Sequence, residues 1–155
     1  MGFRVGAILV GCLILAAYIV GSGFWVQTSG VWYSTLQRPS WQPPNWVFGV
    51  AWPYNFSVLG VAVFVLPGKL TPSLTTVWLV SFAVSVIAAL VWSQQFYGPH
   101  HLAAAAIALA VATLLTVPML VMAFHAGTGI FLALIPYQLW LCVATSLSIG
   151  YAIKN

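Results

Sequence analysis

Residues 5–24 read VGAILVGCLILAAYIVGSGF, a run of apolar and small side chains that contains no charge. A helix needs about 20 such residues to cross the roughly 30 Å hydrocarbon core of a bilayer. The rest of the chain has the same character: 63% of the 155 residues are hydrophobic, 3% are charged, and the mean hydropathy is +1.06. Because soluble domains carry about 25% charged residues, this sequence predicts an integral membrane protein.

Four more apolar runs follow the first, separated by prolines, glycines and polar residues. They predict helices at 44–66, 72–95, 102–124 and 130–153, in addition to the one at 5–24. Backbone groups in lipid must be hydrogen-bonded inside the protein, which favours helices. We therefore expect an all-α fold, in which residues 1–155 form a single domain of five transmembrane helices.

The N-terminal run has an alternative interpretation, because Met1–Arg4 resembles the start of a signal peptide. The apolar run that follows is longer than a signal peptide needs, and Gly21-Ser22-Gly23 is a poor cleavage site. We interpret it as a retained helix of a multi-pass protein in a bacterial cell membrane or an organellar membrane. The basic residues divide equally between the two sides, so the positive-inside rule gives no orientation.

The chain contains no Asp and no Glu, which removes most acid–base, metal-ligand and proton-relay chemistry. No metal site is expected. The basic residues are separate from one another in the sequence: Arg4, Arg38, Lys69 and Lys154. Nucleic-acid binding needs clustered phosphate contacts and is therefore excluded. Cys12 and Cys142 lie in apolar runs without a CxxC spacing, and we expect both to be small buried thiols.

Small residues recur at every fourth position in three of the predicted helices. The series are Ser81, Ser85, Ala89 and Ser93; Ala104, Ala108 and Ala112; and Ala144, Ser148 and Ala152. Residues with this spacing share one helix face, and small side chains let helices in lipid approach closely. Either these faces pack inside one bundle, or one of them, most favourably that of the third helix, is the seam of a homodimer.

Residues 25–43 differ from the apolar runs, because they are aromatic and polar and end in prolines. Pro39, Pro43 and Pro44 prevent a continuous helix and stiffen the segment. Some of its tryptophans fit an aromatic belt at the membrane surface. A rigid aromatic loop is also suited to cover a large, flat, apolar ligand, with Arg38 available for an anionic group. We expect residues 25–43 to form an ordered lid.

From Trp32 to Gly49 the chain reads WYSTLQRPSWQPPNWVFG, and Trp52 follows. With IPYQLW at 135–140, this pattern resembles the TspO/MBR family, also called tryptophan-rich sensory proteins or translocator proteins. The resemblance implies a five-helix membrane bundle, usually homodimeric, that binds tetrapyrroles such as protoporphyrin IX and haem, and in some members sterols, in a cavity among the helices. No cofactor is implied as obligatory, although a porphyrin or haem is a possible bound ligand.

Carried over position by position, the resemblance places a set of residues at the ligand. These are Tyr33, Pro43, Trp52, Trp92, Trp140, Ala144 and Leu147, with Trp41 and Trp46 close by. Several positions are less polar than is common in the family, including Ala89 and Phe56, so we expect an unusually apolar cavity. Trp78 lies outside every motif, near the start of the third helix, and is expected to be an interfacial anchor.

His100 and His101 form a pair in a short loop after Pro99. Histidine is the usual axial ligand of haem, so one of them is a candidate for that role. The alternative, which we favour, is a solvated pair near the lipid headgroups.

Three functions are compatible with these residues. The first is a sensor or carrier that binds a tetrapyrrole. The second is an enzyme that breaks down porphyrin with light and oxygen, for which the resemblance makes Trp52 and Trp140 the candidate catalytic residues. The third is passive movement of a sterol or another small molecule. Proton-coupled transport is disfavoured, because it usually needs ionisable groups inside the membrane.

Overall fold

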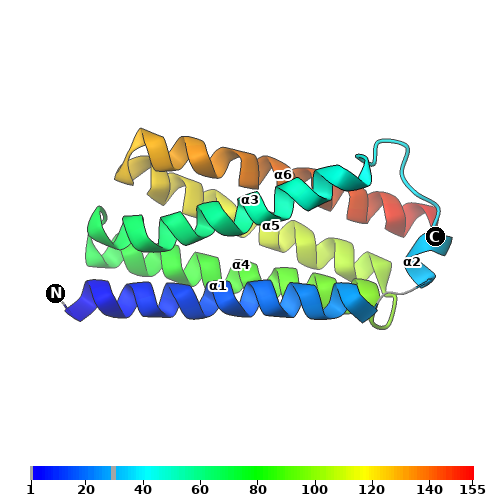
Figure 1. Ribbon diagram of the computed structural model, residues 1–155, viewed down its shortest axis with the longest axis horizontal. Coiled ribbons are helices and arrows are strands. Elements are labelled where there is room, and N and C mark those ends of the chain that lie inside the picture. Colours follow the sequence, from blue (N-terminus) through cyan, green and yellow to red (C-terminus); the bar gives the residue numbers. More distant parts are fainter. Residues whose placement is uncertain (1, 29–30) are drawn as a thin grey trace.

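A computed structural model describes residues 2–28 and 31–155, and every regular element in these ranges is helical. Figure 1 shows long helices lying side by side along one axis. The elements are α1 (Gly2–Thr28), the one-turn α2 (Trp32–Thr35), α3 (Asn45–Val65), the 3₁₀ turn η1 (Leu66–Gly68), α4 (Pro72–Tyr97), α5 (Leu102–Ala126) and α6 (Thr128–Lys154). Five of these helices are long and apolar enough to span a bilayer, so the chain is a multi-pass integral membrane protein.

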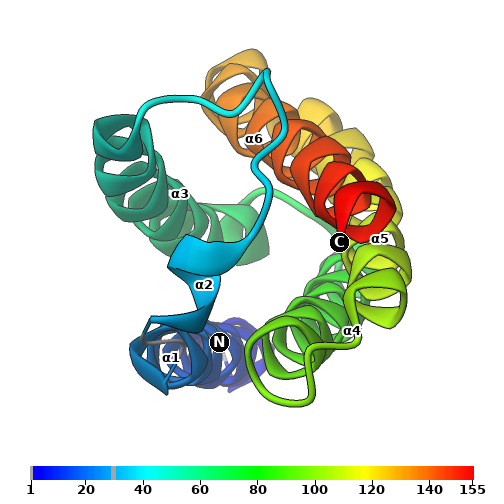
Figure 2. The ribbon, with the colours of Figure 1, turned by 90° about the vertical axis from the view of Figure 1, so that its right-hand side faces the viewer.

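The five long helices form a ring when viewed along the bundle axis (Figure 2). Contacts link them in the order α1, α3, α6, α5, α4 and back to α1. The contacts are dense along α4, α5 and α6 and much sparser on both sides of α3. The segment that contains α2 crosses one end of the ring, and α3 is therefore the wall at which the bundle is least tightly packed.

Two boundaries of the predicted lid differ from the structure. Helix α1 continues to Thr28, so residues 25–28 are helical rather than part of a loop. Trp25 and Val26 extend the apolar run, and no proline or glycine interrupts it before Gly30. Residues 32–35 form the short helix α2, which lies in the middle of the predicted loop. The extended part of the lid is consequently confined to 36–44, where the prolines are.

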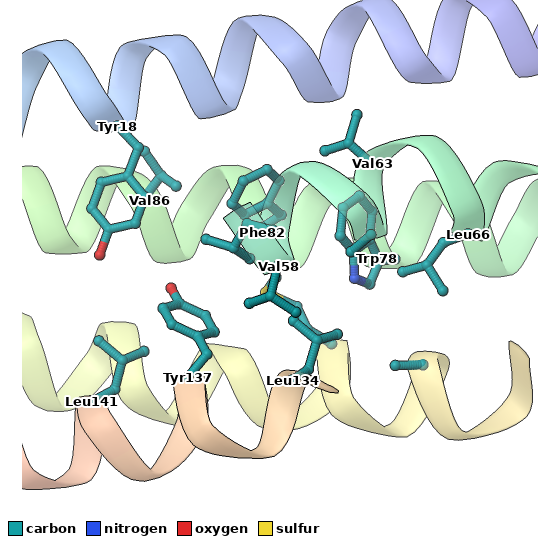
Figure 3. Packing of buried hydrophobic residues seen from close by; sticks show 14 of the residues in the cluster. Tyr18, Val58, Val63, Leu66, Trp78, Phe82, Val86, Leu134, Tyr137 and Leu141 are labelled. Carbon is teal, nitrogen blue, oxygen red and sulfur yellow. The ribbon is translucent and has the colours of Figure 1, made fainter. Parts of the chain in front are cut away.

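Buried apolar side chains from all five long helices form the main core, part of which is seen in Figure 3. Trp78 is its largest side chain and is 0% exposed, with its ring 5.3 Å from that of Phe82. The expectation that Trp78 anchors the protein at the interface was wrong, because its face of α4 turns toward the centre of the bundle. In the same view the hydroxyls of Tyr18 and Tyr137 point toward each other from α1 and α6.

The small residues of α4 pack inside the protomer. Ser81, Ser85, Ala89 and Ser93 are all buried, and the Ser85 hydroxyl donates to the Ala112 carbonyl of α5 at 3.1 Å. This face is thus occupied by neighbouring helices and is not available as a homodimer seam. The two cysteines also differ from expectation, since Cys12 is half-buried and Cys142 is exposed on the outer face of α6.

Candidate functional site

A cavity of about 530 Å³ lies between the core and the lid. Helices α3, α4 and α6 form most of its wall, and Tyr33 of α2 contributes from the lid. The lining residues are Val26, Tyr33, Asn45, Phe48, Gly49, Trp52, Pro53, Trp92, Phe96, Tyr97, Trp140, Ala144, Leu147, Ser148 and Tyr151. This volume falls within the range of about 300–1,000 Å³ that is typical of small-molecule sites.

Helical spacing explains why these residues converge. Asn45, Gly49 and Pro53 are four residues apart and share one face of α3, as Ala144 and Ser148 do on α6. The exposed positions on the rim are Asn45, Gly49 and Pro53 on α3 and Val26 on α1. The cavity therefore reaches the surface between α1 and α3, on the flank of the bundle.

Aromatic rings hold one another in place around the cavity. Trp52 stacks on Phe56 with ring centroids 5.6 Å apart, and Tyr18 meets the edge of Trp52 at 6.3 Å. On the other side, Phe48 of α3 and Trp140 of α6 meet edge to face at 5.1 Å. Each such pair adds about 0.5–1.5 kcal/mol beyond the apolar area that it buries. The walls of the cavity are therefore flat aromatic surfaces whose rings are held by contacts with one another.

The polar groups of the cavity are few and neutral. The Trp92 Nε1–H donates to Ser148 Oγ at 3.1 Å. At the lid end the hydroxyls of Tyr33 and Tyr151 are 3.0 Å apart, and Tyr151 donates to Gln42 Oε1. The indole N–H of Trp140 has no hydrogen-bond partner among the described residues. No basic side chain of the described residues lines the cavity.

The lid is fastened to the last turns of α6. Besides the bond from Tyr151 to Gln42, the backbone of Gln37 pairs with the Asn155 side chain: its N–H donates to Oδ1 at 2.9 Å, and its carbonyl accepts from Nδ2 at 3.3 Å. The Trp41 Nε1–H donates to Ser146 Oγ at 3.3 Å. Pro39 and Trp41 also lie directly over Gly150, where an added Cβ would be only 2.8 Å from each. The lid and the last turns of α6, which are distant in the sequence, thus pack together at one end of the bundle.

The structure brings together six of the predicted site residues in the cavity: Tyr33, Trp52, Trp92, Trp140, Ala144 and Leu147. The others lie elsewhere. Pro43 and Trp46 line a separate groove on the opposite side of α3, and Trp41 lies on the lid over α6. Ala89 is buried in the core of the bundle. Arg38 is exposed on the lid, within electrostatic range of the Tyr151 phenol.

The histidine pair does not line the cavity. His100 stacks on the indole of Trp32, and His101 Nδ1 is 3.1 Å from Gln95 Oε1. The described residues contain no group of three or more His or Cys side chains that could hold a metal ion. An axial role for either histidine toward a ligand inside the cavity therefore has no support in this geometry.

Sequence reasoning missed several residues of the wall. Phe96 and Tyr97 belong to the Trp92 turn of α4, while Phe48 and Tyr151 belong to helix faces that the motifs already marked. A helical projection from Trp140 places Ala144, Leu147 and Tyr151 on one side of α6. That spacing was the available signal for Tyr151.

Comparison with known proteins agrees with this architecture. Residues 8–153 match the model of the TspO/MBR family. The chain is similar to the protein CrtK of Rhodobacter capsulatus, with 28% identity over 90% of this chain and 88% of that protein. It is also similar to the tryptophan-rich protein TspO of Chlorobaculum tepidum (29% identity, 92% and 90% covered) and to the human translocator protein (26% identity, 96% and 85% covered). The chain belongs to the TspO/MBR family.

Proposed function

We propose that the cavity binds a tetrapyrrole, such as protoporphyrin IX or haem, and that the protein acts as a sensor or carrier of that ligand. The observation that carries the proposal is the wall itself, in which Trp52, Trp92 and Trp140 surround a volume of about 530 Å³ and none of the described lining residues is charged. Flat aromatic ligands stack on such surfaces, and each stacking side chain is worth about 1–3 kcal/mol by analogy with base–aromatic stacking.

The acidic groups of such a ligand need a partner outside the apolar wall. Arg38 lies at the lid end, near Tyr151, and a guanidinium pairs well with a carboxylate. The ligand is therefore oriented with its propionates toward the lid and its ring system between α3 and α6. The cavity then recognises shape and stacking, and the lid recognises charge.

A matched pair of substitutions tests the proposal. Ala144→Phe adds a ring inside the cavity, while Ala104→Phe adds the same ring to an exposed position on α5. Titration of the protein in lipid nanodiscs with protoporphyrin IX, followed by the porphyrin absorbance, should show strongly weakened binding for Ala144→Phe alone. Equal binding by both variants contradicts a tetrapyrrole site in this cavity.

A second function has one specific observation in its favour. Trp52 and Trp140 both line the cavity, so two oxidisable indoles would face a bound porphyrin. Light- and oxygen-dependent breakdown of the ligand is the activity that this arrangement would serve. Illumination of the porphyrin complex in air separates the two functions. If the protein degrades porphyrin, the wild-type complex loses its porphyrin absorbance faster than the Trp52→Phe and Trp140→Phe complexes do. If it is a carrier, binding shifts the porphyrin spectrum but illumination does not bleach it faster in the wild type than in the variants.

A further inference from the structure

A second hollow lies on the other side of α3, in a groove between α3 and α6 that we call the α3–α6 groove. Its volume is about 540 Å³, close to that of the cavity, and its lining includes Pro43, Trp46, Val50, Asn55, Pro136 and Val143. Figure 2 shows α3 and α6 as neighbours in the ring. Because Trp46 and Val50 are exposed on the outside of the bundle, this groove faces the lipid.

The two hollows share a single wall residue among those described, which is Trp140. Its indole is 8% exposed, and its N–H has no hydrogen-bond partner. Contact with Phe48 at 5.1 Å is an edge-to-face packing interaction and not a hydrogen bond. Trp140 of α6 is therefore in contact with both the cavity and the groove, and its indole N–H is left without an acceptor among the described residues.

A second unpaired donor belongs to the groove. Asn55 is among its lining residues and is 1% exposed, and its Nδ2 has no partner among the described residues. Next to it, the Tyr54 hydroxyl donates to the Ala133 carbonyl at 2.8 Å and joins α3 to α6. A buried amide without a partner costs about 1–3 kcal/mol, so this position favours an occupant that supplies an acceptor.

We propose that the α3–α6 groove is a second binding site, which takes one flat aromatic molecule carrying a ring-nitrogen or carbonyl acceptor. The choice of ligand class rests on the proposed function of the cavity. The groove matches the cavity in volume, and the indoles of Trp46 and Trp140 offer its occupant aromatic surfaces. A hydrocarbon chain of a lipid fills the same space but leaves Asn55 unpaired. Trp140 contacts the occupants of both sites and couples them.

The number of bound ligands tests this proposal directly. The probe is protoporphyrin IX, titrated into the protein in phosphatidylcholine nanodiscs, and the readout is moles of porphyrin retained per folded chain. Ala51→Phe fills the groove, Ala144→Phe fills the cavity, and Ala104→Phe is the outward-facing control. Wild type and Ala104→Phe are expected to retain two molecules, Ala51→Phe and Ala144→Phe one each, and the double variant none. Val50→Trp fills the groove from an exposed position and should repeat the result of Ala51→Phe without disturbing the core.

The outcomes separate the two sites. If the wild type retains one porphyrin and only Ala144→Phe abolishes its binding, the groove is not a binding site and the cavity proposal stands. If only Ala51→Phe and Val50→Trp reduce the amount retained, the groove is a binding site and the cavity proposal is contradicted. Asn55→Leu, made in the Ala144→Phe background, should weaken the remaining site about tenfold through loss of one hydrogen bond. Unchanged affinity in folded Asn55→Leu protein overturns the hydrogen bond assigned to the Asn55 Nδ2 donor and favours a lipid chain as the natural occupant.

Discussion

His100 and Trp32 stack face to face, with ring centroids 3.7 Å apart and ring planes inclined by 11°. His100 adopts this position with a φ of 62°, a left-handed conformation that is uncommon outside glycine. The stack joins the loop between α4 and α5 to helix α2, whose next residue, Tyr33, lines the cavity. The α4–α5 loop therefore holds the lid from the side opposite to α6.

This stack predicts how the lid responds to substitution. His100→Gly relieves the backbone strain but removes the imidazole, so we expect faster backbone hydrogen exchange in 31–38 with little loss of global stability. Hydrogen exchange followed by mass spectrometry measures this effect, with wild type as the reference. Unchanged exchange in 31–38 of folded His100→Gly would contradict a role of the stack in holding the lid.

Gly150 provides a second test of the lid. A Cβ at this position would be 2.8 Å from Pro39 and Trp41, so Gly150→Ala should displace the lid from α6 and expose the Trp41 indole to aqueous quenchers. Gly129→Ala is the matched control, since it lies in the same helix with nothing within 4 Å of the added atom. That control should be neutral or stabilising by up to about 1 kcal/mol, as expected for Gly to Ala in a helix.

Trp78 and Trp52 should separate stability from binding. Trp78→Ala removes a fully buried ring from the core and should cost about 3–5 kcal/mol of unfolding free energy. The folded fraction should bind porphyrin with unchanged affinity. Trp52 lines the cavity, so Trp52→Ala should weaken porphyrin binding by about 1–3 kcal/mol. Chemical denaturation measures the unfolding free energy, and porphyrin titration of the same samples measures the affinity. Loss of affinity in folded Trp78→Ala would contradict the assignment of the binding site to this cavity.

The role of Arg38 is tested by removing charge from either partner. Arg38→Gln should weaken binding of protoporphyrin IX but not of its dimethyl ester, which lacks carboxylates. Lys69→Gln changes a basic residue in the turn between η1 and α4, away from the lid, and should affect neither ligand. Because a guanidinium keeps its charge, wild-type affinity for the acid should stay nearly constant from pH 6 to pH 8. A marked fall over that range, retained in Arg38→Gln, would point to a histidine partner instead.

The number and type of the helices follow from the sequence because a run of about 20 apolar residues can pair its own backbone groups in lipid only as a helix. Helix ends follow less reliably. Pro44 and Pro72 mark the starts of α3 and α4, whereas nothing at Trp25 stops α1. An apolar run also does not show which face turns inward. Trp46 and Trp52 belong to one motif, yet they lie on opposite sides of α3.

The orientation of side chains depends on neighbours that are distant in the chain. Trp78 and Ala89 give no local sign that they are buried in the core. Asn55 likewise reads as a polar residue in a largely apolar helix, and only the folded bundle shows that it is buried and that its Nδ2 has no partner among the described residues. Sequence motifs identified Tyr33, Trp52, Trp92 and Trp140 of the cavity, whereas the groove arises from packing alone.

The position of Cys142 provides a native labelling site for detecting a ligand in the α3–α6 groove. This thiol is exposed on α6 between Leu139 and Val143, two residues that line the α3–α6 groove, whereas Cys12 is half-buried in α1. Replacement of Cys12 alone leaves a single native attachment point for a spin label or an environment-sensitive dye at the edge of the groove. Occupancy from the membrane side is then measurable in an otherwise unaltered protein, without introducing a cysteine anywhere near the ligand.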